Sequence, residues 1–179
     1  MTLNAAADSS PARATTDPAV LPALAITAIA AATLAGAWFF ELVLDIRPCP
    51  LCLEQRYAYY LAVPLGLALA FAASRRAPQP VLLAGFAVLL LAALANAWLG
   101  GYHAGVEWQF WQGPTDCSGP VVNLGSAGNL LERLDTEKVI RCDEVQWRFL
   151  GLSLAGYNVL ISLAMAATAV WGIVSAKRA

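Results

Sequence analysis

The chain has 179 residues, of which 59% are apolar and 13% are charged, against averages of about 45–50% and about 25% for soluble domains. This composition excludes intrinsic disorder and disfavours an ordinary water-soluble globule. With 11 basic and 12 acidic residues the formal net charge is -1, so no basic surface for nucleic acid is expected.

Four stretches of the chain lack charged side chains and are long enough to cross a lipid bilayer. A spanning helix needs about 20 mostly apolar residues, and a charge at its centre costs roughly 2.5–3.5 kcal/mol. We expect helices at about residues 19–40, 54–73, 81–99 and 149–174. Buried helices of a soluble domain would carry a polar stripe facing water, and these stretches carry none. The predicted fold is an all-α membrane protein with a bundle of four transmembrane helices.

The segment before the first span, residues 1–18, is rich in Ala, Ser, Thr, Asp and Pro. We expect it to be a disordered tail. The triplet Ala35-Gly36-Ala37 raises the alternative of a cleaved signal peptide. A signal peptide begins with basic residues, whereas residues 1–18 carry Asp8, Arg13 and Asp17, so the first span is expected to remain in the membrane.

The charges of the loops predict the orientation in the membrane. An even number of spans places both termini on one face. Arg75 and Arg76 lie in the short loop between the second and third spans, and short loops rich in basic residues stay in the cytoplasm. We therefore expect cytoplasmic termini and periplasmic loops at about 41–53 and 100–148. In the longer loop, residues 128–140 predict a short amphipathic helix lying in the membrane interface.

All four cysteines fall in the two loops on the expected outer face. Cys49 and Cys52 form a CxxC pair just before the second span, and Cys117 and Cys142 lie in the long loop. A disulfide closing that loop would contribute roughly 3.5 kcal/mol, whereas a bond across the CxxC constrains almost nothing. Close CxxC pairs are typical of redox chemistry. No metal site is expected, because only one cysteine pair is close and the sole histidine, His103, is distant in sequence.

Three polar groups are expected at one depth of the membrane. Cys52 lies in the first turn of a helix, where free N–H groups favour a thiolate. Arg56, four residues later, either stabilises this thiolate or a carbonyl ligand, or extends to the lipid headgroups. His103 is either an interfacial hydrogen-bonding residue or part of the same site. Together they suggest a lipid-soluble redox ligand. The loop aromatics are expected to form an interfacial belt, namely Trp108, Phe110, Trp111 and Trp147.

These features together resemble one family, the DsbB disulfide bond formation proteins of the bacterial inner membrane. The resemblance covers about residues 19–175 and rests on the four spans, the helix-entry CxxC with Arg56 after it, and the two loop cysteines. The strings Gly101-Tyr102-His103-Ala104-Gly105-Val106-Glu107-Trp108 and Trp147-Arg148-Phe149-Leu150-Gly151-Leu152 are also similar to that family. Gln55 stands where a family member carries an acid, so that position is assigned no role.

The resemblance implies a thiol oxidase that passes electrons from a soluble periplasmic partner to a membrane quinone. Cys117 would be attacked by the thiolate of a DsbA-like, thioredoxin-fold oxidase, with Cys142 as its loop mate. Electrons would then pass to Cys49 and Cys52. Arg56 and His103 would contact the oxygens of the quinone, which is ubiquinone or menaquinone.

Two other functions fit parts of the pattern. One is a quinone reductase similar to vitamin K epoxide reductase, but there the CxxC follows the loop cysteines, whereas here it comes first. The other is a membrane subunit without enzymatic activity whose loop docks another protein. In that case only the Cys117–Cys142 pair would matter, and the CxxC at the helix entry would have no explanation.

Overall fold

The computed structural model describes residues 17–114 and 141–178. In these ranges the element order is α1 (Val20–Leu42), α2 (Pro50–Ser74), α3 (Gln79–Glu107), β1 (Arg148–Phe149), β2 (Leu152–Ser153) and α5 (Leu154–Arg178). These four helices are each long and apolar enough to cross a membrane, which confirms the predicted fold class. Most of the predicted tail, Cys117 and the predicted interfacial helix at 128–140 lie outside the described residues.

The outer surface of the bundle is apolar. Large side chains such as Leu91, Trp98 and Phe71 point outward and are more than half exposed. Soluble proteins rarely expose contiguous apolar surface of this extent. A hydrocarbon environment removes that cost, so the surface agrees with a bundle embedded in lipid.

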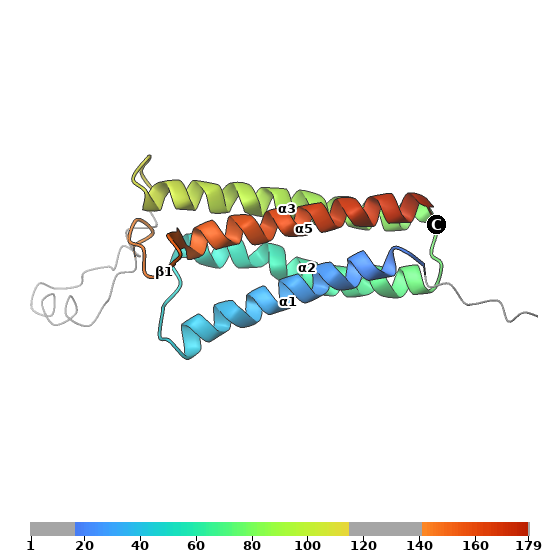
Figure 1. Ribbon diagram of the computed structural model, residues 1–179, viewed down its shortest axis with the longest axis horizontal. Coiled ribbons are helices and arrows are strands. Elements are labelled where there is room, and N and C mark those ends of the chain that lie inside the picture. The colour runs from blue at the N-terminus through green and yellow to red at the C-terminus, as the bar shows by residue number, and fades with distance from the viewer. Residues whose placement is uncertain (1–16, 115–140, 179) are drawn as a thin grey trace, which may run out of the picture.

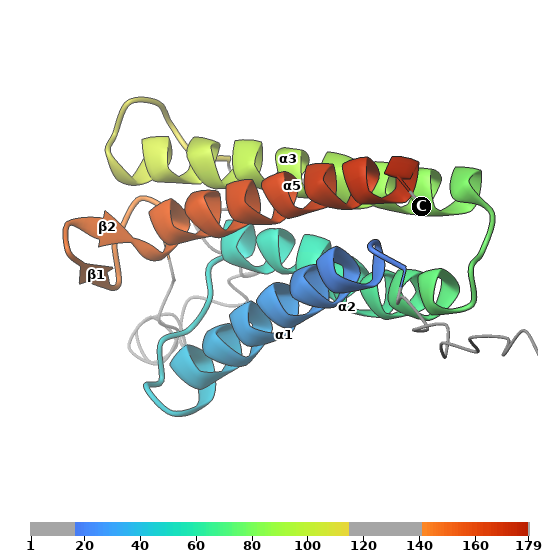
Figure 2. The same ribbon diagram turned by 45° about the vertical axis from the view of Figure 1, so that its right-hand side comes forward.

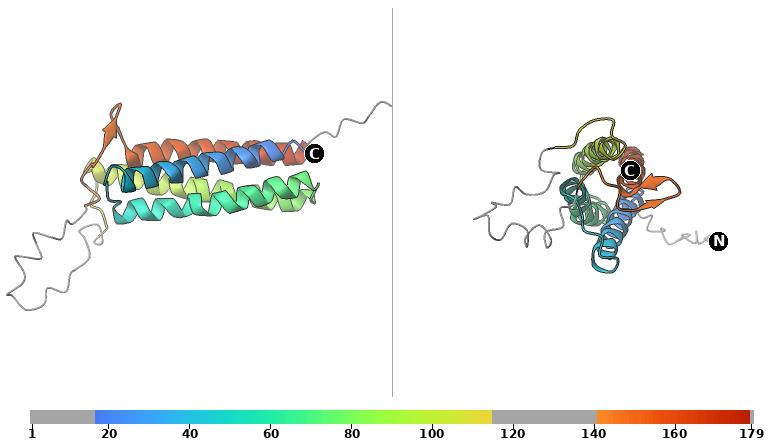
Figure 3. Two further views of the ribbon diagram at one scale, coloured as in Figure 1. Left: turned by 90° about the horizontal axis from the view of Figure 1, so that it is seen from below. Right: turned by 90° about the vertical axis from the view of Figure 1, so that its left-hand side faces the viewer.

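The helices run side by side along the long axis of the molecule, so the bundle has two distinct ends (Figures 1 and 3). The cysteine end is where α1 ends and α2 begins, next to Cys49 and Cys52. The arginine end holds the turn with Arg75 and Arg76, between α2 and α3, and the C-terminal end of α5. The predicted separation of the cysteines from the basic turn is therefore observed.

Small residues allow the helices to approach closely. A methyl group added at Gly172 on α5 would collide with the ring of Phe86 on α3, and one added at Gly66 on α2 would collide with Thr27 on α1. Phe86 is fully buried. Close approach through small residues is the usual packing mode in membranes, where lipid tails are as apolar as the side chains themselves.

Figure 2 shows that α1 diverges from α5 toward the cysteine end. In the opposite direction the two helices come together. The divergence leaves space between α1, α2 and α5 near Cys49 and Cys52, and this space contains the cavity described below.

The third helix extends to Glu107, beyond the predicted end at about residue 99. Gly100 and Gly101 signal a loop in the sequence, yet both lie inside the helix. Gly100 packs against Asn158 and Val159 of α5, where a side chain would collide. The extension adds two turns of helix above the glycines and carries His103 and Glu107 on α3.

The fourth helix begins at Leu154 instead of about residue 149. A two-residue hairpin precedes it, in which Arg148 pairs with Ser153 and Phe149 with Leu152. Leu150 and Gly151 form its turn, with φ of 50° and 84°. Positive φ at both turn positions is the pattern of a type I′ turn, and glycine adopts it without strain. The Ser153 Oγ then accepts a hydrogen bond from the Gly156 N–H at 3.2 Å and caps α5.

Candidate functional site

The CxxC pair forms the entrance to α2. Pro50 is the first helical residue, and Cys49 is the N-cap in extended conformation (φ -75°, ψ 166°). The Cys49 sulfur accepts a hydrogen bond from the Cys52 backbone N–H at 3.3 Å. The two Sγ atoms are 2.8 Å apart, and both cysteines are free thiols. The pair is therefore a dithiol of a buried Cys49 and a partly buried Cys52 whose sulfurs face each other.

The negative charge of this dithiol is favoured on Cys49. The hydrogen bond with the Cys52 side chain lowers the pKa of Cys49 from 9.0 to about 5, and the contact with His103 acts in the same direction, against the effect of burial. At neutral pH Cys49 is then a thiolate. The sequence argument placed the thiolate on Cys52, but the helix N–H group of Cys52 points at the Cys49 sulfur instead.

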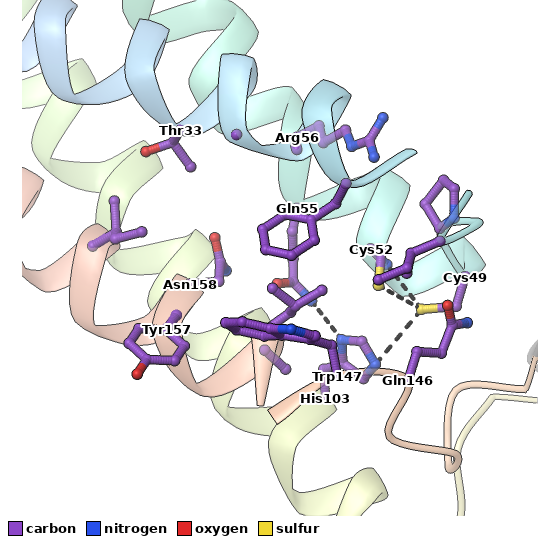
Figure 4. A pocket seen from close by; sticks show the side chains of 18 of the residues that line it. Thr33, Cys49, Cys52, Gln55, Arg56, His103, Gln146, Trp147, Tyr157 and Asn158 are labelled. Carbon is purple, nitrogen blue, oxygen red and sulfur yellow. Dashed lines mark hydrogen bonds between the residues drawn. The ribbon is translucent and has the colours of Figure 1, made fainter. Parts of the chain in front are cut away.

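His103 connects this dithiol to α3. Its Nε2 lies 3.6 Å from the Cys49 Sγ, and its Nδ1 lies 2.9 Å from the Gln55 Nε2. One tautomer satisfies both contacts: the Gln55 amide donates to Nδ1 and Nε2–H donates to the thiolate. Of the two interpretations of His103, the structure places it beside the cysteines, buried at 2% exposure. Figure 4 shows the dithiol, the imidazole and the Gln55 amide in one chain of contacts.

Glu107 lies on α3 one turn beyond His103 and adds a carboxylate to the same group of contacts. Its Oε1 lies 4.0 Å from the His103 Nε2, and its Oε2 accepts a hydrogen bond from the hydroxyl of Ser153. The carboxylate is thereby held between α3 and β2. Gln55, to which the sequence assigned no role, and Glu107 and Ser153 were all missed by the sequence argument. The four-residue spacing from His103 to Glu107 was the available signal.

Arg56 is held by α1. Its Nη1 donates to the Glu41 Oε2 at 2.6 Å, and its guanidinium lies 5.7 Å from the ring centroid of Trp38. The Arg56 side chain is 11% exposed and lines the cavity. Figure 4 shows it directed away from the His103 ring. Arg56 is thus bound to a carboxylate at the cavity wall instead of extending freely along the surface.

A cavity of about 530 Å³ opens beside the dithiol. This volume lies within the range of small-molecule sites, about 300–1,000 Å³. The wall from α1 includes Thr33, Gly36 and Phe40, and the wall from α5 includes Tyr157 and Asn158. Cys52, Gln55, Arg56 and His103 also line it. The cavity is mainly apolar and has redox-active and hydrogen-bonding groups on one side.

A second polar cluster lies deeper, where Tyr59 and Asn158 line the same cavity. The Tyr59 hydroxyl donates to the Asn158 Oδ1 at 2.5 Å, and the Asn96 Nδ2 donates to the same oxygen at 3.2 Å. The Ser162 hydroxyl is hydrogen-bonded to the Tyr59 hydroxyl and accepts from the Asn96 Nδ2. The buried Asn158 Nδ2 has no hydrogen-bond partner among the described residues. A buried amide without a partner costs about 1–3 kcal/mol, and this one lies against Gly100 of α3.

The aromatic residues divide into two groups. Trp108 and Phe110 are exposed beyond the end of α3, as a belt requires. Trp147 differs from the predicted belt because it lines the cavity. Its ring lies 5.0 Å from that of Phe40 and stacks with Phe149 at 5.9 Å. Trp147 therefore joins α1 to the hairpin across the cavity.

The second cysteine pair is described only in part. Cys142 is disulfide-bonded and buried, and it packs in one cluster with Cys49, Leu51 and Val106. Cys117 lies outside the described residues. The packing places one member of the loop pair beside the CxxC.

Comparisons with known proteins give a consistent result. The family model "Disulfide bond formation protein DsbB" matches residues 20–172. The disulfide bond formation protein B of Azoarcus sp. (strain BH72) is 32% identical over 83% of this chain and 88% of its own length. That of Hahella chejuensis is 32% identical over 79% and 84%. An uncharacterized protein of Rickettsia prowazekii, RP370, is 24% identical over 79% and 80%. No solved structure matches the chain significantly.

Proposed function

The chain belongs to the DsbB family, and on this premise we propose that it oxidises a soluble DsbA-like dithiol protein and passes the electrons to a membrane quinone. Membership makes it a multi-pass inner-membrane oxidoreductase that forms disulfide bonds. The quinone acceptor, the DsbA-like donor, the roles of individual residues and the periplasmic position of the cysteine end are the proposed parts.

One observation carries this proposal: the Cys49–Cys52 dithiol lies in the wall of an apolar cavity at the end of a transmembrane bundle. Such a cavity can admit a ligand that lives in lipid. The thiols of a soluble partner cannot enter it, so a second pair must meet them in water. The loop pair, of which Cys142 packs beside Cys49, fits this role.

The side chains of the cavity fit a quinone. A quinone ring is flat and apolar and carries carbonyl acceptors on opposite edges. The cavity offers the hydrogen-bond donors Arg56 and His103 near the dithiol, and the Asn158 side chain lines it deeper in the bundle. A bound quinone supplies an acceptor for two electrons and two protons.

The exchange between pairs follows from ordinary thiol–disulfide chemistry. The partner's dithiol reduces the loop disulfide and becomes a disulfide. The loop dithiol in turn reduces a Cys49–Cys52 disulfide. The dithiol of Cys49 and Cys52 then loses two electrons and two protons to the quinone and reforms its S–S bond, so the net reaction is dithiol plus quinone giving disulfide plus quinol.

His103, Gln55 and the Arg56–Glu41 pair stabilise the charges that form during this cycle. The imidazole lies 3.6 Å from the sulfur that carries the negative charge, so its Nε2–H can donate to the thiolate. Gln55 fixes the ring from the other side at 2.9 Å. The Arg56–Glu41 pair places a fixed cation at the cavity wall, where it can bind a carbonyl oxygen.

The orientation follows from the two ends of the bundle. Arg75, Arg76, Lys177 and Arg178 cluster at the arginine end. Short basic segments stay in the cytoplasm. The proposal therefore places the cysteine end in the periplasm, where the partner is found.

The experiment is a turnover assay with purified protein, a reduced DsbA-like protein and a soluble quinone, followed by quinone absorbance. We expect turnover in the wild type and none in Cys52→Ala. Leu53→Ala is the matched control, since Leu53 is exposed in the same helical turn. Equal turnover in Cys52→Ala and the wild type would reject the proposal.

A further inference from the structure

We propose that the reduced form of this site binds one thiophilic divalent cation such as Zn²⁺ through Cys49, Cys52, His103 and Glu107. The ligand atoms of the first three lie within 4.8 Å of one another. His103 is 54 residues from Cys49 in sequence, so no metal-binding pattern could be recognised from residue spacing. The longer α3 brings the imidazole and the Glu107 carboxylate to the CxxC.

The distances are close to those of a tetrahedral zinc site. Zn–S bonds of about 2.3 Å and Zn–N bonds of about 2.0–2.1 Å separate sulfur and nitrogen ligands by about 3.5 Å. The Cys49 Sγ and His103 Nε2 are 3.6 Å apart. The two sulfurs, 2.8 Å apart, would have to move to about 3.8 Å, which a rotation of the Cys52 side chain can supply.

Glu107 supplies the fourth ligand. Its Oε1 lies 4.0 Å from the His103 Nε2, about 0.6 Å beyond the separation in a tetrahedral site. The hydroxyl of Ser153 holds the other carboxylate oxygen. The carboxylate lies outside the 4.8 Å group formed by Cys49, Cys52 and His103, so its other oxygen has to turn toward the sulfurs to complete the site while Ser153 keeps its hydrogen bond.

Three of the four ligands, His103, Cys49 and Glu107, already have the kind of partner that supports metal sites. Metal-bound histidines usually hydrogen-bond through their other nitrogen, and the His103 Nδ1 lies 2.9 Å from the Gln55 amide. Rotating that amide by half a turn presents its oxygen to Nδ1–H and frees Nε2 for the cation. Cys49 already accepts the Cys52 backbone N–H, a common contact of ligating cysteines at helix starts.

The binding reaction balances without an oxidant. At neutral pH, where Cys49 is already a thiolate, the cation replaces the one remaining thiol proton, that of Cys52, so M²⁺ plus R–S⁻ plus R–SH gives M(SR)₂ plus one H⁺, and no electron moves. The disulfide form has no thiolates to offer and should not bind. Since metal-bound sulfurs cannot join to each other, the cation would hold the site in its reduced state.

The test uses Co²⁺ as a spectroscopic probe for the zinc site, on the full chain carrying Cys117→Ser and Cys142→Ser so that two cysteines remain. We expect one Co²⁺ per reduced chain, with the visible bands of tetrahedral cobalt–thiolate coordination, release of one proton at neutral pH, and displacement by Zn²⁺. The chain oxidised at Cys49 and Cys52 should show none of these.

Variants separate the proposed site from a bare dithiol. Glu107→Gln keeps the size of the side chain and a hydrogen bond to Ser153, and it should weaken binding at least about tenfold. His103→Gln should do the same. Glu144→Gln, which removes another carboxylate lining the cavity, should leave the affinity unchanged. Equal affinity in Glu107→Gln, His103→Gln and the parent would overturn the proposal, whatever the quinone assay shows.

Discussion

The largest cause of the low pKa of Cys49 is the hydrogen bond with the Cys52 thiol, and His103 and the Cys52 backbone N–H add to it. A hydrogen bond to a charged group contributes about 1.5–3 kcal/mol, and 1.36 kcal/mol corresponds to one pKa unit. Cys52→Ala should therefore raise the pKa of Cys49 by about 1–2 units. Cys52→Ser retains a hydroxyl donor and should leave the pKa near its wild-type value of about 5.

A rate at a single pH would not detect this change. At pH 7, lowering the pKa from 9.0 to about 5 raises the thiolate fraction about a hundredfold. The intrinsic nucleophilicity falls at the same time by about 40- to 100-fold, from a Brønsted coefficient of about 0.4–0.5. The two effects nearly cancel, so the pKa has to be measured from the whole pH profile.

The assay is the ultraviolet absorbance of the thiolate, titrated in chains that also carry Cys117→Ala and Cys142→Ala. In both Cys52 variants the signal then comes from Cys49 alone. Because the folded pKa is lowered, the thiolate persists as the pH falls and disappears only near the folded pKa. A common pKa in Cys52→Ala and Cys52→Ser, or a Cys49 that titrates near 9 in Cys52→Ser, would refute the reasoning.

Three further changes test other parts of the structure. Arg56→Met should raise the KM for quinone. Glu41→Gln should raise this KM less, because the substitution frees the guanidinium without removing it. If Arg56→Met has the same KM as the control Glu54→Gln, Arg56 serves the membrane surface instead. Asn158→Ala should raise the KM for quinone about threefold to tenfold, the value of one hydrogen bond, and an unchanged KM would show that its free amide does not face the ligand. Gly172→Ala should lower the free energy of unfolding in detergent by about 1–3 kcal/mol, since the added methyl meets Phe86. Gly36 has open space beside it, so Gly36→Ala should leave the free energy of unfolding unchanged. Equal melting temperatures of Gly172→Ala and Gly36→Ala would contradict the packing at Gly172.

The fold was predictable because membrane helices have a strong signal in a single sequence. A stretch such as residues 19–40 contains no charge, and hydrocarbon admits few other structures. The helix ends were less predictable. Gly100 and Gly101 favour a loop on local grounds, but Gly100 is required for contact with Asn158, which is distant in sequence.

In the site, too, local features were predictable from the sequence and contacts between helices were not. The CxxC and Arg56 are local patterns, so their place at the start of α2 could be foreseen. The partners of these residues come from other helices: Gln55 matters because His103 of α3 faces it, and Arg56 binds Glu41 of α1. Contacts between helices depend on their rotation and tilt, which one sequence does not reveal.

The most direct test of the electron route is a single turnover without any partner protein. The chain with Cys117→Ala and Cys142→Ala is reduced, freed of reductant and mixed with one equivalent of quinone. We expect one quinol per chain and one disulfide between Cys49 and Cys52, identified by mass spectrometry. Quinone that stays oxidised while both thiols remain free would contradict the transfer of electrons from this dithiol into the cavity.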